Sequence, residues 1–209
     1  GTRGNGVRLS TNNGTNWITP SNELWDKYIL SLAVSGNNIF AGTSFGVFRS
    51  TNNGTNWTSV GITNLDIESF AVSGTNFFAG TNGGAFRTTD NGSNWTYVSN
   101  GLMYQDIRAL AVSGTNLFAG TYGGGVFLSL NNGSPLISVN NGLTNYNIYS
   151  LAVSGTSFFA GTEGSGVFLS TNNGTNWTSV NNGLTNQSIR SLAVSGTNVF
   201  AGTDSGGVF

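Results

Sequence analysis

The stretch IRALAVSGTNLFAGT, residues 107–121, recurs five times in closely related form and decides the fold. Its central valine returns at Val34, Val72, Val112, Val153 and Val194, in steps of 38, 40, 41 and 41 residues. A fixed period of this length is typical of an array of supersecondary units, none of which buries its apolar face alone. We therefore expect one array that includes the whole chain.

Each repeat is predicted to form four short antiparallel strands. In the repeat that contains the stretch above, residues 107–112 alternate apolar with small or polar side chains, as a half-buried strand does. Further strands are expected at 117–121, 125–129 and 136–139, separated by turns rich in Gly and Asn. No convincing helical period of 3.6 residues is present. Four antiparallel strands per unit of about 40 residues predict a blade of a β-propeller.

The fold class expected is all-β, a single five-bladed β-propeller over residues 1–209. The expected blades are residues 28–61, 66–101, 106–142, 147–183, and 188–209 together with 1–22. In this arrangement the last blade is closed by both termini, which removes exposed sheet edges.

Two segments match the third strand of the closing blade, because residues 1–8 align with residues 202–209. The other repeats have Phe where the C-terminal copy has Phe209 and the N-terminal copy has Arg8. Burial of an unpaired Arg is costly, so Phe209 is expected in this position. Either the second copy lies over the surface or shares the position end to end, or one copy pairs with a neighbouring molecule. The residues assigned to ring closure or assembly are Val7, Arg8, Val208 and Phe209.

A second motif, Ser/Thr-x-Asn/Asp-x-Gly-x-x-Trp, follows the third strand of four repeats, and a degenerate copy runs from Ser129 to Leu136. The Asn or Asp side chain can bond the backbone of its own turn, so a structural role is expected. The motif residues are Ser10, Asn12, Gly14, Trp17, Ser50, Asn52, Gly54, Trp57, Asp90, Gly92, Trp95, Ser170, Asn172, Gly174 and Trp177.

This motif resembles the Asp-box, or BNR, repeat of secreted sialidase-like and photosystem assembly factor-like propellers. The resemblance covers nearly the whole chain. It implies that the motif links the third and fourth strands at the blade periphery, away from the ligand site. Most copies have Asn where the family favours Asp, and Asp90 keeps the acid.

The composition excludes several classes of chemistry. Only 7% of residues are charged, and the formal net charge of −1 provides no basic stripe for nucleic acid. Cys and His are absent, which removes disulfides, thiol nucleophiles, histidine bases and the usual zinc sites. No cofactor or metal is expected. A neutral surface rich in Asn, Thr and Ser favours an extracellular or cell-surface protein, and no apolar run approaches the ~20 residues of a membrane span.

The charged residues do not form an obvious catalytic set. Arg108 and Arg190 hold matching repeat positions, but the equivalents are Leu30, Glu68 and Tyr149, so a sialidase-like Arg triad is not supported. Pairs such as Asp66/Glu68 and Asp106/Arg108 could meet across neighbouring blades near the central channel. A paired-carboxylate glycosidase is one interpretation of these groups. A solvated polar ring at the strand entrance is the simpler one, and we expect no enzymatic activity.

Variation between repeats is concentrated in the connections from fourth to first strands and in the turns from second to third strands, which share one face of a propeller. The candidate residues for a ligand or partner there are Trp25, Tyr28, Phe45, Tyr104, Tyr122, Tyr146 and Tyr149. Two functions follow. The first is a structural or interaction module that polymerises head to tail with itself into a filament or surface layer. The alternative is a lectin-like module whose aromatic face binds a glycan, although a protein partner or a purely cavity-filling role fits the same residues.

Overall fold

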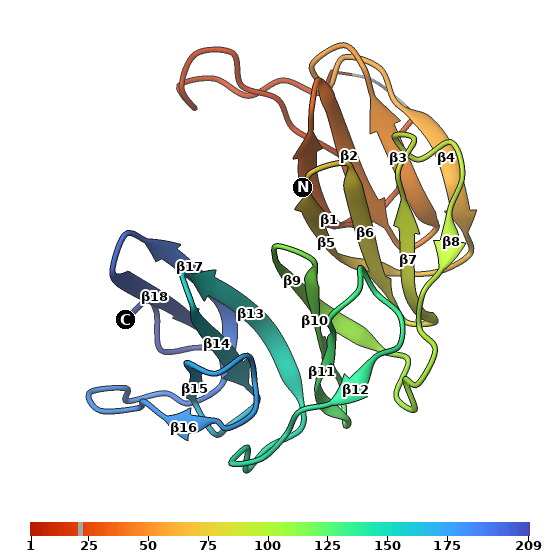
Figure 1. Ribbon diagram of the computed structural model, residues 1–209. Coiled ribbons are helices and arrows are strands. Elements are labelled where there is room, and N and C mark those ends of the chain that lie inside the picture. The colour runs from red at the N-terminus through yellow and green to blue at the C-terminus, as the bar shows by residue number, and fades with distance from the viewer. Residues whose placement is uncertain (21–22) are drawn as a thin grey trace.

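The computed structural model describes residues 1–20 and 23–209, and its regular structure in that part of the chain consists of β-strands (Figure 1). The first sheet contains β1 (Ile29–Ser35), β2 (Asn38–Thr43), β3 (Gly46–Ser50) and β4 (Thr58–Thr63). The second contains β5 (Ile67–Ser73), β6 (Asn76–Thr81), β7 (Gly84–Thr88) and β8 (Thr96–Tyr97). The third contains β9 (Ile107–Ser113), β10 (Asn116–Thr121), β11 (Gly125–Ser129) and β12 (Ile137–Ser138). The fourth contains β13 (Ile148–Ser154), β14 (Ser157–Thr162), β15 (Val167–Ser170) and β16 (Thr178–Ser179), and the fifth pairs β17 (Ile189–Ser195) with β18 (Asn198–Thr203).

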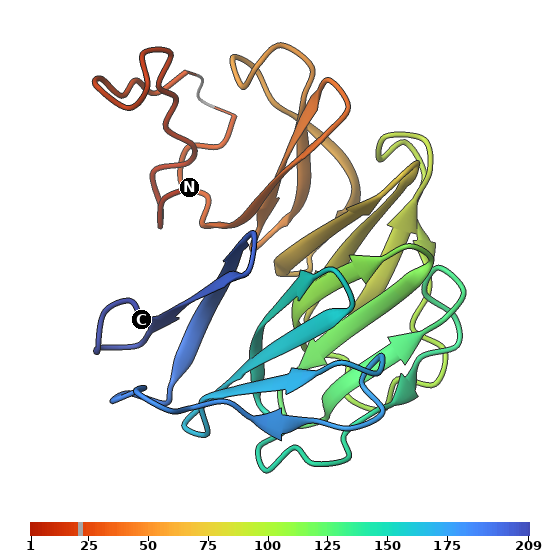
Figure 2. The same cartoon turned by 60° about the vertical axis from the view of Figure 1, so that its left-hand side comes forward.

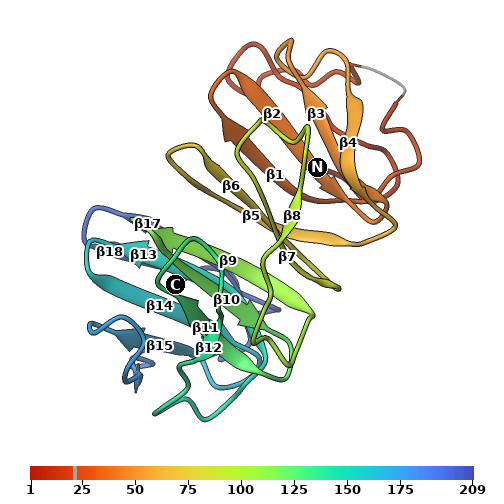
Figure 3. The same ribbon diagram turned by 45° about the vertical axis from the view of Figure 1, so that its right-hand side comes forward.

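The five sheets are the blades of a five-bladed β-propeller, which confirms the predicted fold class. Each sheet is antiparallel, with its strands in chain order. The first strands β1, β5, β9, β13 and β17 pack successively against one another along the inside of the array. Figure 3 shows β9, β13 and β17 side by side, and Figure 2 shows the blades following one another in an arc.

The core lies between neighbouring blades rather than within one. Phe78 of the second blade packs in one buried cluster with Leu110 of the third, and Phe118 of the third packs with Phe158 of the fourth. The ring centres of Phe118 and Phe158 are 4.2 Å apart. Since each inner blade supplies one half of two such interfaces, the repeat itself determines the core.

A glycine fixes how closely two blades approach. A Cβ added at Gly80 would lie 2.7 Å from Ile107 Cγ2 of the next blade, and one added at Gly120 would lie 2.6 Å from Ile148 Cγ2. No real Cβ tolerates such a distance, so these positions require Gly. The same contact recurs at Gly1, where an added Cβ would lie 2.6 Å from Ile29 Cγ2.

The N-terminal segment, residues 1–20, therefore packs on the first blade as the outer part of a preceding blade would. The Ile29 N–H donates to the Thr2 oxygen at 3.0 Å, and Leu9 pairs with Ile18 as third and fourth strands do elsewhere. Val7 packs in the cluster that buries Trp57 of the first blade.

The fifth blade differs from the expected arrangement, in which both termini complete one sheet. Its third-strand position is taken by the same chain's C-terminal residues: the N–H and the carbonyl of Phe209 both bond Ala201, at 3.0 and 2.9 Å. Val208 pairs with Gly202, whereas Arg8 is exposed in the N-terminal segment. The physical reason is the duplication itself. Gly1 and Thr2 take the place beside Ile29 that the Gly-Thr pair of the preceding blade takes beside the equivalent isoleucines.

The turns after the third strands have one repeated set of hydrogen bonds. The Ser50 Oγ accepts the Gly54 N–H at 2.9 Å, and the Asn52 Oδ1 accepts the Asn56 N–H at 2.9 Å. Equivalent pairs form in the turns that start at Ser10, Thr88 and Ser170. The motif therefore builds a self-contained turn, as expected of residues with a structural role.

Asp90 is the acidic member of this set, and it makes the second blade sensitive to acid. Hydrogen bonds from the side chain and backbone of Asn94, followed by the Thr88 hydroxyl, lower the pKa of Asp90 from 3.8 to about 2. A lowered pKa stabilises the fold above the unfolded-state pKa, and this contribution is lost as the pH falls through the folded-state value. We expect Asp90→Asn to remove this part of the acid destabilisation between about pH 4 and pH 2, as measured by thermal melts across that range. Asn52→Asp, which places an acid in the neighbouring turn, should add to it. Identical acid profiles for all three proteins would contradict this role.

Candidate functional site

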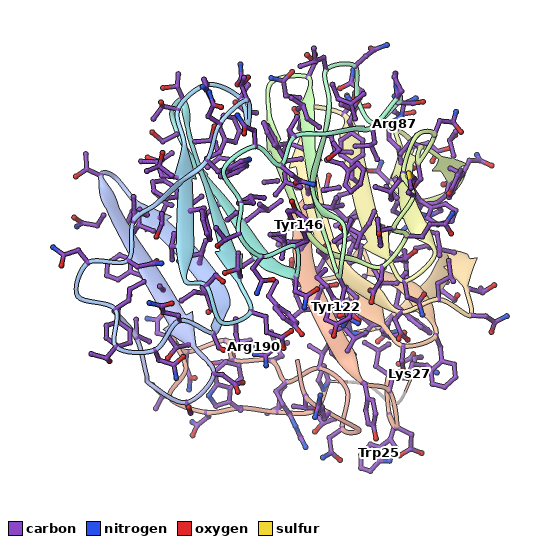
Figure 4. All side chains as sticks on the ribbon, turned by 90° about the horizontal axis from the view of Figure 1, so that it is seen from below. Trp25, Lys27, Arg87, Tyr122, Tyr146 and Arg190 are labelled. Carbon is purple, nitrogen blue, oxygen red and sulfur yellow. The ribbon has the colours of Figure 1, made fainter. Side chains whose placement is uncertain are left out.

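The candidate site lies on what we call the loop face, formed by the turns from second to third strands and the connections from fourth to first strands. Backbone hydrogen bonds join the two kinds of loop within a blade. The Tyr122 N–H donates to the Asp106 oxygen at 2.9 Å, and the Asp204 N–H donates to the Ser188 oxygen at 2.9 Å. Bonds between blades extend the face, since the Gly123 N–H donates to the Tyr146 oxygen at 3.1 Å. Figure 4 shows Tyr122, Tyr146 and Arg190 near the middle of this view, with Trp25 and Lys27 at its edge.

Two of the predicted aromatic residues share a cavity. Tyr104 and Tyr146, with Met103, line an open cavity of about 290 Å³. Asn140 lies in the same wall and is held there by its own bonds: its Nδ2 donates to the Gly124 oxygen at 2.8 Å. The cavity thus has aromatic walls and a fixed amide beside them.

A second pair of predicted aromatics, Tyr122 and Tyr149, meets edge to face with ring centres 6.4 Å apart. The guanidinium of Arg190 lies over the Tyr149 ring at 4.3 Å, a favourable cation–π distance. The Tyr149 hydroxyl donates to Glu163 at 3.2 Å, and Arg190 bonds Asp204 at 3.0 Å. These groups bind one another across the fourth and fifth blades.

A matching ionic group joins the second and third blades, as the sequence suggested for these charges. Arg108 bonds Glu68 of the neighbouring blade at 3.0 Å and Asp106 at 2.8 Å. Burial raises the pKa of Glu68, and the charge of Arg108 opposes that shift. Both Glu68 and Asp106 are thus bound by one guanidinium, which is the arrangement of a structural ion pair between blades.

The remaining predicted aromatics lie elsewhere on the loop face. Lys27 places its ammonium 5.1 Å from the centre of the Phe45 ring. Tyr28 lies beside Gly4 of the N-terminal segment, and Trp25 is exposed. The predicted residues therefore form separate groups, not one continuous platform. Sequence reasoning missed Lys27 and Asn140. For Asn140 a signal was available, because Asn181 holds the same position in the next repeat and makes the same bonds.

The motif tryptophans occupy two environments. Trp57 and Trp177 are buried and Trp95 is partly buried, as the structural role implies. Trp17 is 63% exposed, although its turn has the same hydrogen bonds. The motif therefore forms the same turn in all four copies, but Trp17, unlike the other three motif tryptophans, is largely exposed.

The repeated four-stranded blades with loops gathered on one face define a β-propeller. No model of a known protein family matches the chain, and no curated protein matches it. Within residues 1–20 and 23–209, no helix has the length and apolar character needed to cross a membrane.

Several solved propeller structures are similar to the chain in fold. YCF48 bound to a D1 peptide is 16% identical, with a TM-score of 0.74 over 99% of this chain and 72% of that one. The extracellular domain ascribed to the hybrid two component system BT3049 from B. thetaiotaomicron is 20% identical, with a TM-score of 0.79 over 97% of this chain. An ancestral GH74 enzyme is 22% identical, with a TM-score of 0.68 over 83% of this chain. This chain spans 29% and 27% of the latter two, so the likeness to them concerns one part of a longer protein.

Proposed function

We propose that this protein is a non-catalytic extracellular interaction module that binds copies of itself end to end. The support for this proposal comes from the two ends of the arc of blades. The first and last blades of the arc expose opposite halves of the apolar interface that the chain forms repeatedly between its own blades.

Inside the arc, this interface joins a Phe on the second strand of one blade to the first strand of the next. Phe78 packs in one cluster with Leu110 and Val112, and Phe118 packs with Leu151. Burial of such a side chain stabilises the contact by about 1.5–3 kcal/mol. The interface is therefore the main source of cohesion between blades.

At the two ends of the arc the same positions are uncovered. Leu32 and Val34 on β1 are 47% and 64% exposed, and Phe200 on β18 is 43% exposed. These residues are the repeat equivalents of Leu110, Val112 and Phe118, which pack between blades. The first strand of the first blade thus has no Phe packed on it, and the fifth blade exposes such a Phe.

A second copy would cover the exposed residues at both ends. Closure within one chain would have to alter the packing of the four interfaces that set the arc. The contact would join two different surfaces, so it is heterologous, and it produces an open polymer unless the rotation happens to close.

A catalytic role is less well supported by the site. The carboxylates of Glu68 and Asp106 are bound by Arg108, and Glu163 is bound by Tyr149 and Asn147. A glycosidase needs one carboxyl group free to protonate and another free to attack or activate water. An extracellular location is supported by the neutral, Asn- and Thr-rich composition and by the similarity to an extracellular propeller domain.

The direct test is the mass of the native particle as a function of concentration, measured by multi-angle light scattering. We expect the mass of the particle to rise with concentration through multiples of the mass of one chain. A protein that keeps the mass of one chain at every concentration would show that the exposed ends do not bind one another.

A second function is favoured by the Tyr104–Tyr146 cavity. Aromatic faces bury the apolar surface of a sugar ring, and a fixed amide such as that of Asn140 orients its hydroxyl groups. Glycan binding on the loop face is compatible with self-association, because the exposed ends of the arc use other residues.

Tyr104→Ala combined with Tyr146→Ala tests this second function. Loss of two stacking faces should weaken binding of a glycan identified on an array by roughly tenfold or more, and leave the melting temperature nearly unchanged. Phe45→Ala, another exposed aromatic on the same face, is the control and should bind as the wild type does. If the double variant retains full affinity, the cavity is not the glycan site.

A further inference from the structure

Two cavities lie next to each other on the loop face, one at the third blade and one at the fourth. The first is the Tyr104–Tyr146 cavity described above. The second has a volume of about 430 Å³, and the connection from the third to the fourth blade separates the two. Tyr146 of that connection lines the first cavity, whereas Thr144 lines the second. The second cavity is lined by residues that include Thr144, Ser165, Phe168, Ser179, Asn181 and Gln187.

The same repeat positions provide a fixed amide and a serine hydroxyl in both cavities. The Asn140 Nδ2 donates to the Ser138 Oγ at 2.9 Å, and the Asn181 Nδ2 donates to the Ser179 Oγ at 2.8 Å. Each of the two amide oxygens also accepts a backbone N–H at 2.7 Å. Because a hydroxyl that accepts one bond still has its own proton to donate, each serine can donate to a ligand.

Tyr146 and Gln187 occupy equivalent positions in successive connections. The Tyr146 oxygen accepts two glycine N–H groups of the neighbouring turn at 3.1 and 2.9 Å, and the Gln187 oxygen accepts two at 3.1 and 2.8 Å. The two side chains therefore start from the same backbone arrangement but differ in chemistry. A phenol ring lines the first cavity and an amide lines the second.

In the second blade the chain itself fills the corresponding space. Tyr97 takes there the repeat position of Ser138 and Ser179, and its ring meets that of Phe86 edge to face with centres 5.4 Å apart. A Cβ added at Gly84 would lie 2.9 Å from the Tyr97 Cε2. The smaller serines of the third and fourth blades leave this space open.

We infer that the two cavities bind one neutral, linear glycan as consecutive subsites. This inference rests on the glycan binding proposed for the Tyr104–Tyr146 cavity and specifies the ligand of that site. Equivalent groups at equivalent positions suit a ligand that itself repeats one unit, and every residue that lines the two cavities is uncharged. Sheets that pack face to face lie about 10 Å apart, so the ligand must contain several sugar units to reach both cavities.

The two subsites would hold different parts of the ligand. The tyrosines of the first cavity would bury the apolar face of one sugar unit. Thr144, Ser179 and Gln187 of the second would bond the hydroxyl groups of a unit further along the same glycan. The first subsite thus provides the apolar contact, and the second makes the affinity depend on ligand length.

The first test is the affinity of the protein for linear neutral oligosaccharides of increasing length. Cello-, xylo-, manno- and malto-oligosaccharides, from disaccharide to hexasaccharide, are titrated by calorimetry. In the series that binds, the hexasaccharide should bind roughly tenfold or more tightly than the disaccharide, since it reaches the second subsite without a separate binding event. Equal affinities would overturn the two-subsite inference while single-cavity binding stands. If no series binds, the glycan function itself is wrong, and the inference falls with it.

The second test compares Gln187→Ala with Gln105→Ala. Gln105 holds the same repeat position at the second blade, where Tyr97 fills the corresponding space, so it is the matched control. Gln187→Ala should weaken hexasaccharide binding by roughly fivefold through lost hydrogen bonds and leave disaccharide binding unchanged. Gln105→Ala should change neither. Both glutamines are exposed, so both variants should melt like the wild type.

An exchange of side chains between the subsites completes the test. Gln187→Tyr adds an aromatic face to the second cavity and should tighten hexasaccharide binding by roughly fivefold. Tyr146→Gln should weaken the binding of both lengths. If Gln187→Ala and Gln187→Tyr both bind the hexasaccharide as the wild type does, the second cavity is not part of the glycan site.

Discussion

Phe200→Asp is expected to remain a single chain at concentrations at which the wild-type protein polymerises. Phe200 is the repeat equivalent of Phe118, and it is 43% exposed at the end of the arc. Association would bury the new carboxylate against the apolar Leu32 and Val34 of the next molecule. Burial of an unpaired charge costs several kcal/mol, so each joint should weaken by on the order of a hundredfold or more.

Phe45→Asp is the matched control, because it places the same charge on an exposed Phe of the loop face. It should polymerise as the wild type does, by light scattering at the same concentrations. Equal polymer formation by Phe200→Asp and the wild type would remove the blade face from the proposed joint. A loss of polymer in both variants would point to net charge rather than to that face.

The second large effect is expected on stability. Phe118→Ala should lower the free energy of unfolding by about 3–5 kcal/mol, since it leaves a cavity between two blades. Phe118 is buried and packs against Phe158, with ring centres 4.2 Å apart, so the surrounding side chains can fill the space only in part. Urea denaturation followed by tryptophan fluorescence measures the change.

Phe200→Ala is the control for position, because it makes the same substitution at the same place in the repeat. In dilute single chains it should cost well under the loss caused by Phe118→Ala, since the side chain is already partly in water. If the two variants lose equal stability, the fifth blade is as closely packed as the third, and the arc does not end in an uncovered face.

Much of the fold could be predicted from the sequence because the repeat specifies strands locally. In the third blade the expected strands at 107–112, 117–121 and 125–129 lie within one residue of β9, β10 and β11. That the turns from second to third strands lie beside the connections from fourth to first strands also followed from strand order alone. These features depend on alternation and turn chemistry, which each repeat carries within itself.

The placement of the terminal segments could not be predicted in the same way. Trp17 and Trp57 lie in nearly identical motifs, and yet only Trp57 is buried. The difference arises from the neighbouring blade, which the local sequence does not encode. Likewise, Gly1 and Gly202 begin equivalent segments that suit the same position beside an isoleucine, and a local pattern cannot decide which copy occupies it.

The closely packed glycines between blades have a consequence for the shape of the molecule. At Gly80, Gly120 and Gly161 a single added carbon would lie 2.6–2.7 Å from an isoleucine methyl group of the next blade. Alanine there would act as a wedge on the inner side of the arc and rotate everything beyond it by the same angle. Because the blades follow one another in series, a small opening at Gly120 would move the two ends by a much larger distance. The curvature of the propeller therefore depends on the absence of one methyl group at each joint.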